Sequence, residues 1–282
     1  MTENEILIVG LGLIGGSYAE ALTNAGFRVG AIDRDMESVR YALDRGIIAE
    51  GTDTVEKEFV SRYRLIVFCL YPNTFVEWIK DWQDFIAPGT LITDVSGVKV
   101  PVVYKVQSML RPDLEFIGAH TMAGRERSGV ANSDCSVFKG ANYLVTPTAA
   151  NTPEAIEKCK ELGRVMGFGK ISELSPEEHD EMIGFLSQLT HCVAVSLMTC
   201  RETSEMARYS GDSFRDLTRI AAINETMWSE LFLLNRDVLI RQIDMFTGSM
   251  EALKKAIADG DTETLKAVMR ESSRKRKLFE KK

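Results

Sequence analysis

The N-terminal part of the chain alternates short apolar runs with stretches whose apolar residues recur at helical spacing. Apolar runs that suit buried parallel strands lie at residues 5–9, 27–32, 65–70, 90–93, 116–118 and 143–146. Helical patterns fall between and after them, at residues 16–25, 40–45, 74–85, 102–110 and 153–166. This repeated alternation predicts a mostly parallel, doubly wound sheet with helices on both faces.

The pattern changes near Ser172. Ser175, Pro176 and Glu178 form a helix start, with Ser at the N-cap, Pro at the first helical position and Glu three residues after the cap. No later run reads as a strand, and helices are predicted at residues 175–208, 213–224, 226–250, 250–258 and 261–279. Helical tails of this kind often pair between subunits, so the layout predicts a homodimer.

Three glycines follow the first predicted strand in the order G-L-G-L-I-G. They permit a tight turn, close approach of the backbone to a pyrophosphate and close helix–strand packing, while the helix N-terminus offers free N–H groups. The second strand ends at Asp33, 18 residues after Gly15, close to the spacing of a carboxylate that binds ribose hydroxyls. The pattern predicts a dinucleotide site formed by Gly10, Gly12, Leu13, Ile14, Gly15, Asp33 and Arg34.

The same loop bears on the choice of dinucleotide. A carboxylate at Asp33 hydrogen-bonds a 2′-hydroxyl and repels a 2′-phosphate, which favours NAD. Arg34 could stack on adenine or accept a phosphate, so NADP remains an alternative. We therefore predict an α/β fold, with a Rossmann-type NAD-binding domain over residues 1–173 and an all-helical substrate and dimerisation domain over residues 174–282.

Composition narrows the class of protein. The 282 residues are 45% apolar with a net charge of −7, which gives no electrostatic reason to expect nucleic acid. No apolar run approaches the roughly 18 residues needed to span a bilayer, and the acidic N-terminus leads directly into a strand, unlike a signal peptide. The five scattered cysteines indicate a reducing cytoplasm, with neither a disulfide framework nor metal-ligand spacing.

The chain has three histidines, which restricts the choice of acid–base group. His120 follows an apolar run and precedes small residues and a charged cluster, so it is either an active-site imidazole or a surface residue. His179 lies among acidic residues and is expected to be solvated. His191 lies off the apolar stripe of its helix, facing either a pocket or a partner helix, and both a structural and a ligand role are open.

A second candidate for chemistry lies further along the chain. Asp216 and Arg219 are three residues apart on one predicted helix face. They form either a surface ion pair or a guanidinium that is held by a carboxylate and presented to a substrate carboxylate. Trp228 is either a core residue or a pocket wall.

Six segments carry a resemblance to a known family: G-L-G-L-I-G-G-S (10–17), D-V-S-G-V-K (94–99), G-A-H-T-M-A-G-R-E-R-S-G (118–129), S-Q-L-T-H-C-V-A (187–194), F-R-D-L-T-R-I-A (214–221) and M-W (227–228). In this order and spacing, over nearly the whole chain, they resemble the prephenate/arogenate dehydrogenases of tyrosine biosynthesis. The first motif is shared by many dehydrogenases, whereas the third and fifth are much more specific.

The resemblance implies oxidative decarboxylation of prephenate or arogenate with NAD. By family position, His120 would take the proton of the ring hydroxyl as hydride leaves, with Ser96 as a second catalytic residue. Arg219 would bind the ring carboxylate, and Asp216 and Glu126 would hold Arg219 or gate the pocket. His191 and Trp228 would line the side-chain end of the substrate.

The sequence departs from the family pattern at three places. The family usually has Gly-Ser where this chain has Ser96-Gly97, which displaces the serine that orients the histidine or contacts substrate and nicotinamide. It usually has Pro where this chain has Thr121, and Asp-Pro where this chain has Asn224-Glu225. Many members also carry a C-terminal regulatory domain, and tyrosine inhibition through such a domain is not expected here.

Two other interpretations remain open. The first is another Rossmann-type dehydrogenase for small acids, which usually relies on a lysine in its helical domain; residues 174–250 contain no lysine. The second is a non-catalytic NAD-binding sensor, which would bind the cofactor without turnover.

Overall fold

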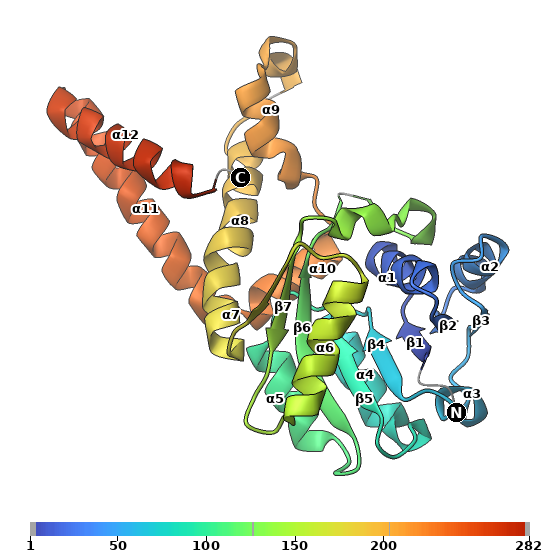
Figure 1. Cartoon of the computed structure of the whole chain (residues 1–282). Coiled ribbons are helices and arrows are strands. Elements are labelled where there is room, and N and C mark those ends of the chain that lie inside the picture. Colours follow the sequence, from blue (N-terminus) through green and yellow to red (C-terminus); the bar gives the residue numbers. More distant parts are fainter. Residues whose placement is uncertain (1–3, 126, 203, 280–282) are drawn as a thin grey trace. The chain divides into compact units, whose positions relative to one another are not determined.

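The larger part of the molecule is built on one eight-stranded sheet. The computed structural model describes residues 4–125, 127–202 and 204–279, and the chain divides into two compact units, residues 1–235 and 236–282. The strand order is β3-β2-β1-β4-β5-β6-β7-β8 (Figure 1). The strands are β1 Glu5–Val9, β2 Arg28–Ile32, β3 Glu50–Thr52, β4 Leu65–Phe68, β5 Leu91–Asp94, β6 Glu115–Met122, β7 Asn142–Thr146 and β8 Lys170–Glu173.

Strands β1 to β6 are parallel, β7 runs antiparallel to β6, and β8 is parallel to β7. The prediction of a mostly parallel, doubly wound sheet is confirmed. Strands β3 and β8 were not predicted, because the short sequences E-G-T and K-I-S-E carry too few apolar residues to stand out. His120 was predicted to follow a strand but lies within β6, where it pairs with Leu144.

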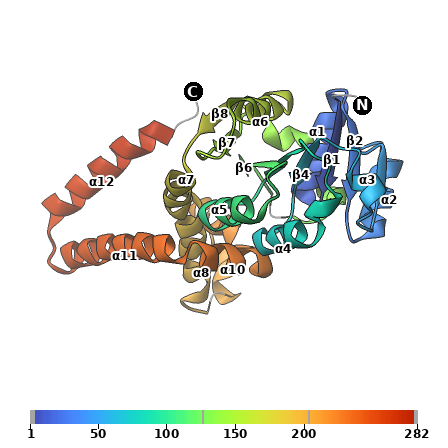
Figure 2. The same ribbon diagram turned by 90° about the horizontal axis from the view of Figure 1, so that it is seen from below.

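Helices cover both faces of the sheet. The helices of the sheet region are α1 Leu13–Asn24, α2 Met36–Asp44, α3 Lys57–Val60, α4 Pro72–Trp82, α5 Val100–Met109 and α6 Pro153–Val165. Helices α1 and α6 lie on one face, and α4 and α5 on the other (Figure 2). Because successive side chains of a strand point to opposite faces, the central strands contribute side chains to two cores, one on each face of the sheet.

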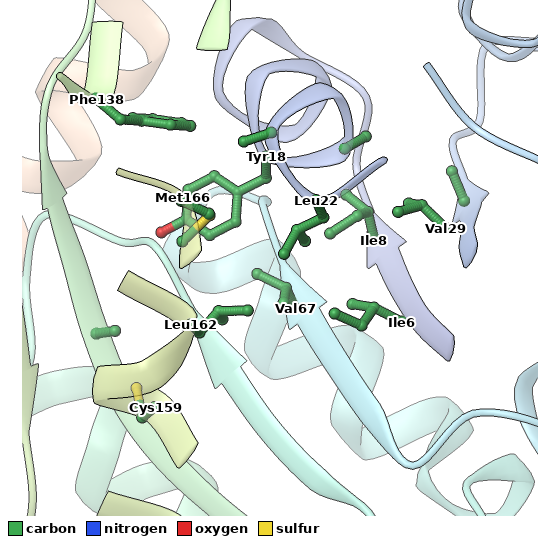
Figure 3. Close-up of a cluster of buried hydrophobic side chains, with 14 of the residues drawn as sticks. Ile6, Ile8, Tyr18, Leu22, Val29, Val67, Phe138, Cys159, Leu162 and Met166 are labelled. Carbon is green, nitrogen blue, oxygen red and sulfur yellow. The ribbon is translucent and has the colours of Figure 1, made fainter. Parts of the chain in front are cut away.

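Strand β1 illustrates this division. Ile6 and Ile8 pack in the core under α1 and α6, whereas Leu7 and Val9 pack in the core under α4 and α5. Figure 3 shows the first core, where Tyr18 and Leu22 of α1 lie near Ile8 and Val67, with Leu162 and Met166 beside them. Burial of each such aliphatic side chain contributes about 1.5–3 kcal/mol to the stability of the folded state. The two cores therefore stabilise the sheet from both faces.

Beyond residue 175 the described residues form helices joined by short turns and loops, and none of these residues lies in a strand. In the larger unit these are α7 Pro176–Ile183, a π-helical segment Gly184–Leu189, α8 Thr190–Thr199, α9 Asp212–Thr218 and α10 Glu225–Leu234, with 3₁₀ turns at Ser204–Tyr209 and Arg219–Ala221. The smaller unit holds α11 Arg236–Ala258 and α12 Thr262–Arg276. An all-helical region after the sheet is confirmed.

Several predicted helix boundaries were wrong. The helix predicted at residues 175–208 ends at Thr199, and the helix predicted at residues 213–224 ends at Thr218. The predicted break at residue 250 is absent, because Gly248 lies inside α11 without ending it, and an isolated glycine costs a helix only about 1 kcal/mol. The chain instead breaks at Asn235, whose buried side chain donates to the carbonyl oxygen of Asp180 (3.0 Å) and to Oε1 of Gln188 (2.8 Å). The predicted start of α7 is confirmed by a complete capping box between Ser175 and Glu178.

Candidate active site

The glycine loop follows β1 at the carboxyl edge of the sheet. Gly10 has φ +98°, and a Cβ there would lie 2.6 Å from the carbonyl oxygen of Cys69. A Cβ at Gly15 would lie 1.8 Å from the carbonyl oxygen of Gly10, so the loop and the first turn of α1 touch directly. A Cβ at Gly12, in contrast, would meet nothing within 4 Å. The loop is therefore closely packed on its inner side and open where α1 begins.

Asp33 fixes this loop from the end of β2. Its carboxylate accepts hydrogen bonds from the backbone N–H groups of Leu11 (2.5 Å) and Asp35 (2.9 Å). Asp33 is half-buried and Arg34 is exposed. Leu13 and Ile14 begin α1, and Ile14 packs against the first core. An open helix N-terminus with a carboxylate at the end of the next strand suits a dinucleotide with free ribose hydroxyls.

A buried ion pair lies where β5 ends. Lys99 is fully buried, and its Nζ donates to both carboxylate oxygens of Asp94 at 2.8 Å. Burial lowers the pKa of Lys99, and the neighbouring carboxylate opposes that shift. Asp94 also accepts from the backbone N–H of Ala119 in β6 (3.1 Å), so this pair joins β5 to β6 beside the candidate histidine.

The hydroxyl of Ser96 is bound to this pair. It donates to Asp94 and lies 3.0 Å from the carbonyl oxygen of Val98. The residue beside the imidazole of His120 is instead Gly97: a Cβ there would lie 3.7 Å from Nε2 of His120. The reversed order of Ser96 and Gly97 therefore places the hydroxyl on the ion pair and leaves the position next to Nε2 without a side chain.

His120 is half-buried near the carboxyl end of β6. Its Nδ1 lies 2.9 Å from Nε2 of His179, while its own Nε2 faces Gly97 and Leu231. Burial, together with the neighbouring His179 and Lys99, holds the pKa of His120 well below its usual value. The imidazole is therefore neutral at neutral pH and can accept a proton at Nε2.

His179 is not solvated as predicted. It is completely buried in α7, and its Nδ1 lies 2.8 Å from Oδ1 of Asp180. The prediction was wrong because the acidic residues around His179 suggested a solvated helix face. Glu177 and Glu181 of α7 are indeed exposed, but His179 and Asp180 are buried. The spacing to His120 gives no local signal, since the two histidines are 59 residues apart.

Asp180 is the second residue that the sequence did not single out. Its carboxylate accepts from the backbone N–H groups of Lys99 (2.7 Å) and Val100 (2.9 Å), and so it caps the start of α5. Burial raises its pKa to about 6. Above that pH it is a carboxylate that receives three hydrogen bonds, one of them from His179.

His191 and Trp228 lie together. Their rings stack with centroids 3.7 Å apart and planes inclined by 30°, and Nδ1 of His191 lies 2.9 Å from the carbonyl oxygen of Ser187. Trp228 is one helical turn before Leu231 on α10, and Leu231 lies next to Gly97. The two rings are thus on the side of α10 that leads to His120.

The remaining predicted residues lie on the surface of α9 and the turn after it. Arg219 is exposed in the 3₁₀ turn Arg219–Ala221, and Asp216 is exposed in α9. On the same helix, Arg215 pairs with Asp212 at 2.8 Å. Glu126 lies outside the described residues.

Comparison with known proteins gives a consistent result. Residues 18–169 match the family model described as prephenate dehydrogenase, nucleotide-binding domain, and residues 175–271 match the one described as prephenate dehydrogenase, dimerization domain. The chain is 32% identical to the prephenate dehydrogenase of Bacillus subtilis (strain 168) over 270 residues, covering 93% of this chain and 72% of the relative. It is 29% identical to the cyclohexadienyl dehydrogenase of Zymomonas mobilis, covering 96% and 94% of the two chains.

Solved structures agree. The prephenate dehydrogenase of Aquifex aeolicus, in complex with hydroxyphenyl propionate and NAD⁺, superposes with a TM-score of 0.90 at 31% identity over 99% of both chains. The arogenate dehydrogenase of Synechocystis shares the fold, with a TM-score of 0.83 at 21% identity over 98% of this chain and all of the other. With both family models and a relative of this similarity, the chain belongs to the prephenate dehydrogenase family.

Proposed function

We propose that this chain catalyses the NAD-dependent oxidative decarboxylation of prephenate to 4-hydroxyphenylpyruvate. The observation that carries the proposal is His120: a neutral imidazole at the carboxyl edge of the sheet, with Nε2 directed to the gap beside Gly97. The glycine loop opens at the same edge, where cofactors of doubly wound sheets bind. The enzyme class is an NAD-dependent oxidoreductase, as the family implies.

His120 would act as the base. The ring hydroxyl of prephenate donates a hydrogen bond to Nε2, which takes the proton as hydride leaves the carbinol carbon. NAD supplies the hydride acceptor when bound. Loss of carbon dioxide then leaves its bonding electron pair in the ring, which becomes aromatic, and the phenolic oxygen regains the proton from Nε2.

The glycine loop would hold NAD. Gly12 and the start of α1 would face the pyrophosphate, and Asp33 would bind the adenosine ribose, with Arg34 beside it. The support is the open position at Gly12 together with a carboxylate that the loop N–H groups already orient. The same carboxylate repels a 2′-phosphate and so favours NAD over NADP.

The helical part would bind the substrate carboxylates and side chain. We assign Arg219 to the ring carboxylate, with Asp216 and Glu126 in supporting roles, and the stacked pair of His191 and Trp228 to the side-chain end. The support for the pair is its position one helical turn from Leu231, which borders Gly97. Ser96 would act through the Asp94–Lys99 pair rather than by contact with substrate.

We also propose a cytoplasmic homodimer, with a functional boundary between residues 173 and 174. The helix Pro176–Thr199 is long and apolar enough to cross a membrane by length and composition. Of its apolar segment, 28% is buried within this chain, so most of the segment is left exposed. A partner subunit would cover such a surface, which fits the dimerisation model over residues 175–271. The molar mass in solution by light scattering tests this, and a monomer at micromolar concentration would contradict it.

The test of the activity is steady-state reduction of NAD and NADP with prephenate and with arogenate, in four combinations, with the aromatic product identified by chromatography. We expect turnover with prephenate and NAD. Turnover with arogenate alone would keep the mechanism and change the product to tyrosine. NAD binding by calorimetry without turnover in any combination would instead support a cofactor-binding sensor.

A further inference from the structure

A buried chain of three side chains ends at the imidazole of His120. Nδ1 of His120 lies 2.9 Å from Nε2 of His179, and Nδ1 of His179 lies 2.8 Å from Oδ1 of Asp180. His179 and Asp180 are both almost fully buried and come from α7, whereas His120 lies in β6. The proposed reaction uses only the last member of this chain, so the other two groups require an explanation.

The direction of the hydrogen bonds follows from Asp180. This carboxylate already accepts from the backbone N–H groups of Lys99 and Val100, so it can only accept from His179 as well. Nδ1 of His179 must therefore carry a proton. Burial and the nearby Lys99 lower the pKa of His179, so its ring is neutral and its Nε2 has a lone pair.

That lone pair determines the proton position on the neighbouring ring. Two unprotonated nitrogens 2.9 Å apart would repel each other, so Nδ1 of His120 carries the proton and donates it to His179. Because the ring of His120 is neutral, its Nε2 is left without a proton. Nε2 is the atom that faces Gly97 and Leu231, where the substrate hydroxyl would lie.

We propose that His179 and Asp180 are positioning residues that fix the tautomer of His120, with the proton on Nδ1 and Nε2 available as the base. The proposal rests on the proposed dehydrogenase reaction. When Nε2 takes the hydroxyl proton, the resulting imidazolium keeps its hydrogen bond to His179, and the carboxylate of Asp180 polarises His179 toward it. The proton returns from Nε2 to the product oxygen, so His179 and Asp180 start and end each turnover unchanged.

The first test reads the tautomer directly. The chain holds three histidines, so two-dimensional NMR of the full-length protein labelled with ¹⁵N-histidine reports each ring. In the wild type at neutral pH we expect the proton of His120 on Nδ1, and in His179→Leu we expect it to move to Nε2 or to divide between the two nitrogens. A wild-type proton on Nε2, or an unchanged tautomer in His179→Leu, would overturn the proposal.

Matched variants separate positioning from packing. His191→Gln removes the third histidine and assigns its signal, and it should leave the tautomer of His120 unchanged. His179→Gln retains an amide oxygen that can accept from Nδ1 of His120, so it should preserve the tautomer that His179→Leu loses. If His179→Leu fails to fold, Asp180→Asn provides the second variant, because one amide oxygen cannot replace a carboxylate that receives three hydrogen bonds.

Kinetics give an independent reading. His179→Leu should lower kcat about 10- to 100-fold with less than a threefold change in KM for prephenate and unchanged NAD affinity, and His179→Gln should recover most of the loss. Equal loss in both variants would reduce His179 to a packing role. The NMR result does not depend on turnover, so an inactive wild type with the expected tautomer would refute the proposed substrate and leave the tautomer assignment intact.

Discussion

The glycine loop and the histidine site lie at the same edge of one sheet but are constructed differently. The loop uses the backbone of residues 10–15, and Asp33, whose side chain binds the loop, directly follows the next strand. The histidine site uses side chains from β5, β6, α7 and α10, brought together over more than 130 residues. A site made of adjacent backbone tolerates variation elsewhere, whereas a site made of distant side chains depends on the packing of the whole larger unit.

The substitution with the largest expected effect should impair turnover at the histidine site and leave cofactor binding at the glycine loop unchanged. His120→Ala removes the proposed base and should lower turnover about 10²- to 10⁴-fold, while NAD affinity stays within twofold. Steady-state kinetics and calorimetric NAD titration check this. His179→Gln is the matched control, and an unimpaired His120→Ala enzyme would remove the imidazole from the mechanism.

Arg219→Ala tests whether the histidine site extends to the turn after α9. Removing one partner of a charge-assisted pair costs about 2–5 kcal/mol, so KM for prephenate should rise at least about 30-fold with little change in NAD affinity. Arg215→Ala is the matched control, because Arg215 is an exposed residue of α9, the helix before this turn, where it pairs with Asp212. Equal effects of the two substitutions would assign Arg219 a structural role.

Two glycines within the loop should respond in opposite ways. A Cβ at Gly12 meets only open space, so Gly12→Ala should leave the melting temperature unchanged but weaken NAD binding about tenfold, as expected when overpacking costs 1–3 kcal/mol. Gly15→Ala would place its Cβ against the carbonyl oxygen of Gly10 and should lower the melting temperature itself. Thermal unfolding with and without NAD distinguishes them, and an unchanged NAD affinity in Gly12→Ala would place the pyrophosphate elsewhere.

The histidine site should also make stability depend on pH in a way the loop does not. The pKa values of His120 and His179 are lower in the folded protein than the value of about 6.5 that histidine has in an unfolded chain. Below about pH 6.5 the two histidines therefore take up protons when the protein unfolds, and their contribution to stability is lost as the pH falls. The pKa of Asp180 is raised to about 6, so this carboxyl has the opposite effect on the pH dependence of stability. The other charged groups that face the cluster are Lys99 and Asp94.

With two histidines acting against one carboxyl, unfolding takes up protons on balance, so the free energy of unfolding should decrease as the pH falls from 7 to 5. Urea unfolding of the wild type at pH 7, 6 and 5 should show this slope, and His179→Gln should flatten it. A steeper slope in the variant would contradict the assignment of these groups.

The smallest expected effect concerns the reversed dipeptide. A Cβ at Gly97 would be in ordinary van der Waals contact with Leu231 and Nε2 of His120, at 3.6 and 3.7 Å. Gly97→Ser would therefore fit and place a hydroxyl beside the imidazole, as in the usual family order. We expect kcat to change about two- to fivefold without loss of stability, and a fall in melting temperature of several degrees would show that the position does not accept a side chain.

The two regions also differ in how far the sequence predicts them. The strand, the glycines and Asp33 are close in sequence, so their pattern predicts both the structure of the loop and its ligand class. His120 could be singled out as a candidate, but its partner His179 could not, because only the fold brings α7 against β6. His179 and Asp180 stand in an acidic first helical turn that reads as solvated, and burial of such a pair depends on donors at the start of α5.

The helical part shows a second limit. Positions on α7 and α8 were assigned to faces by α-helical spacing, but Gly184–Leu189 is π-helical and shifts the phase of every later residue. The sequence therefore did not determine whether His191 faces a pocket or a partner helix, and only the structure shows that its ring stacks on Trp228. The short edge strands β3 and β8 were not predicted for a different reason, which is that they bury few side chains.

The cap that Asp180 forms on α5 has a consequence for recombining this protein with its relatives. Its carboxylate lies on one side of the proposed boundary at residues 173 and 174, and the N–H groups of Lys99 and Val100 lie on the other. A chimera that joins the sheet of one relative to the helices of another must therefore inherit a carboxylate at this position. Without it, the graft would leave the N–H groups of Lys99 and Val100 unpaired where α7 of one parent packs against α5 of the other.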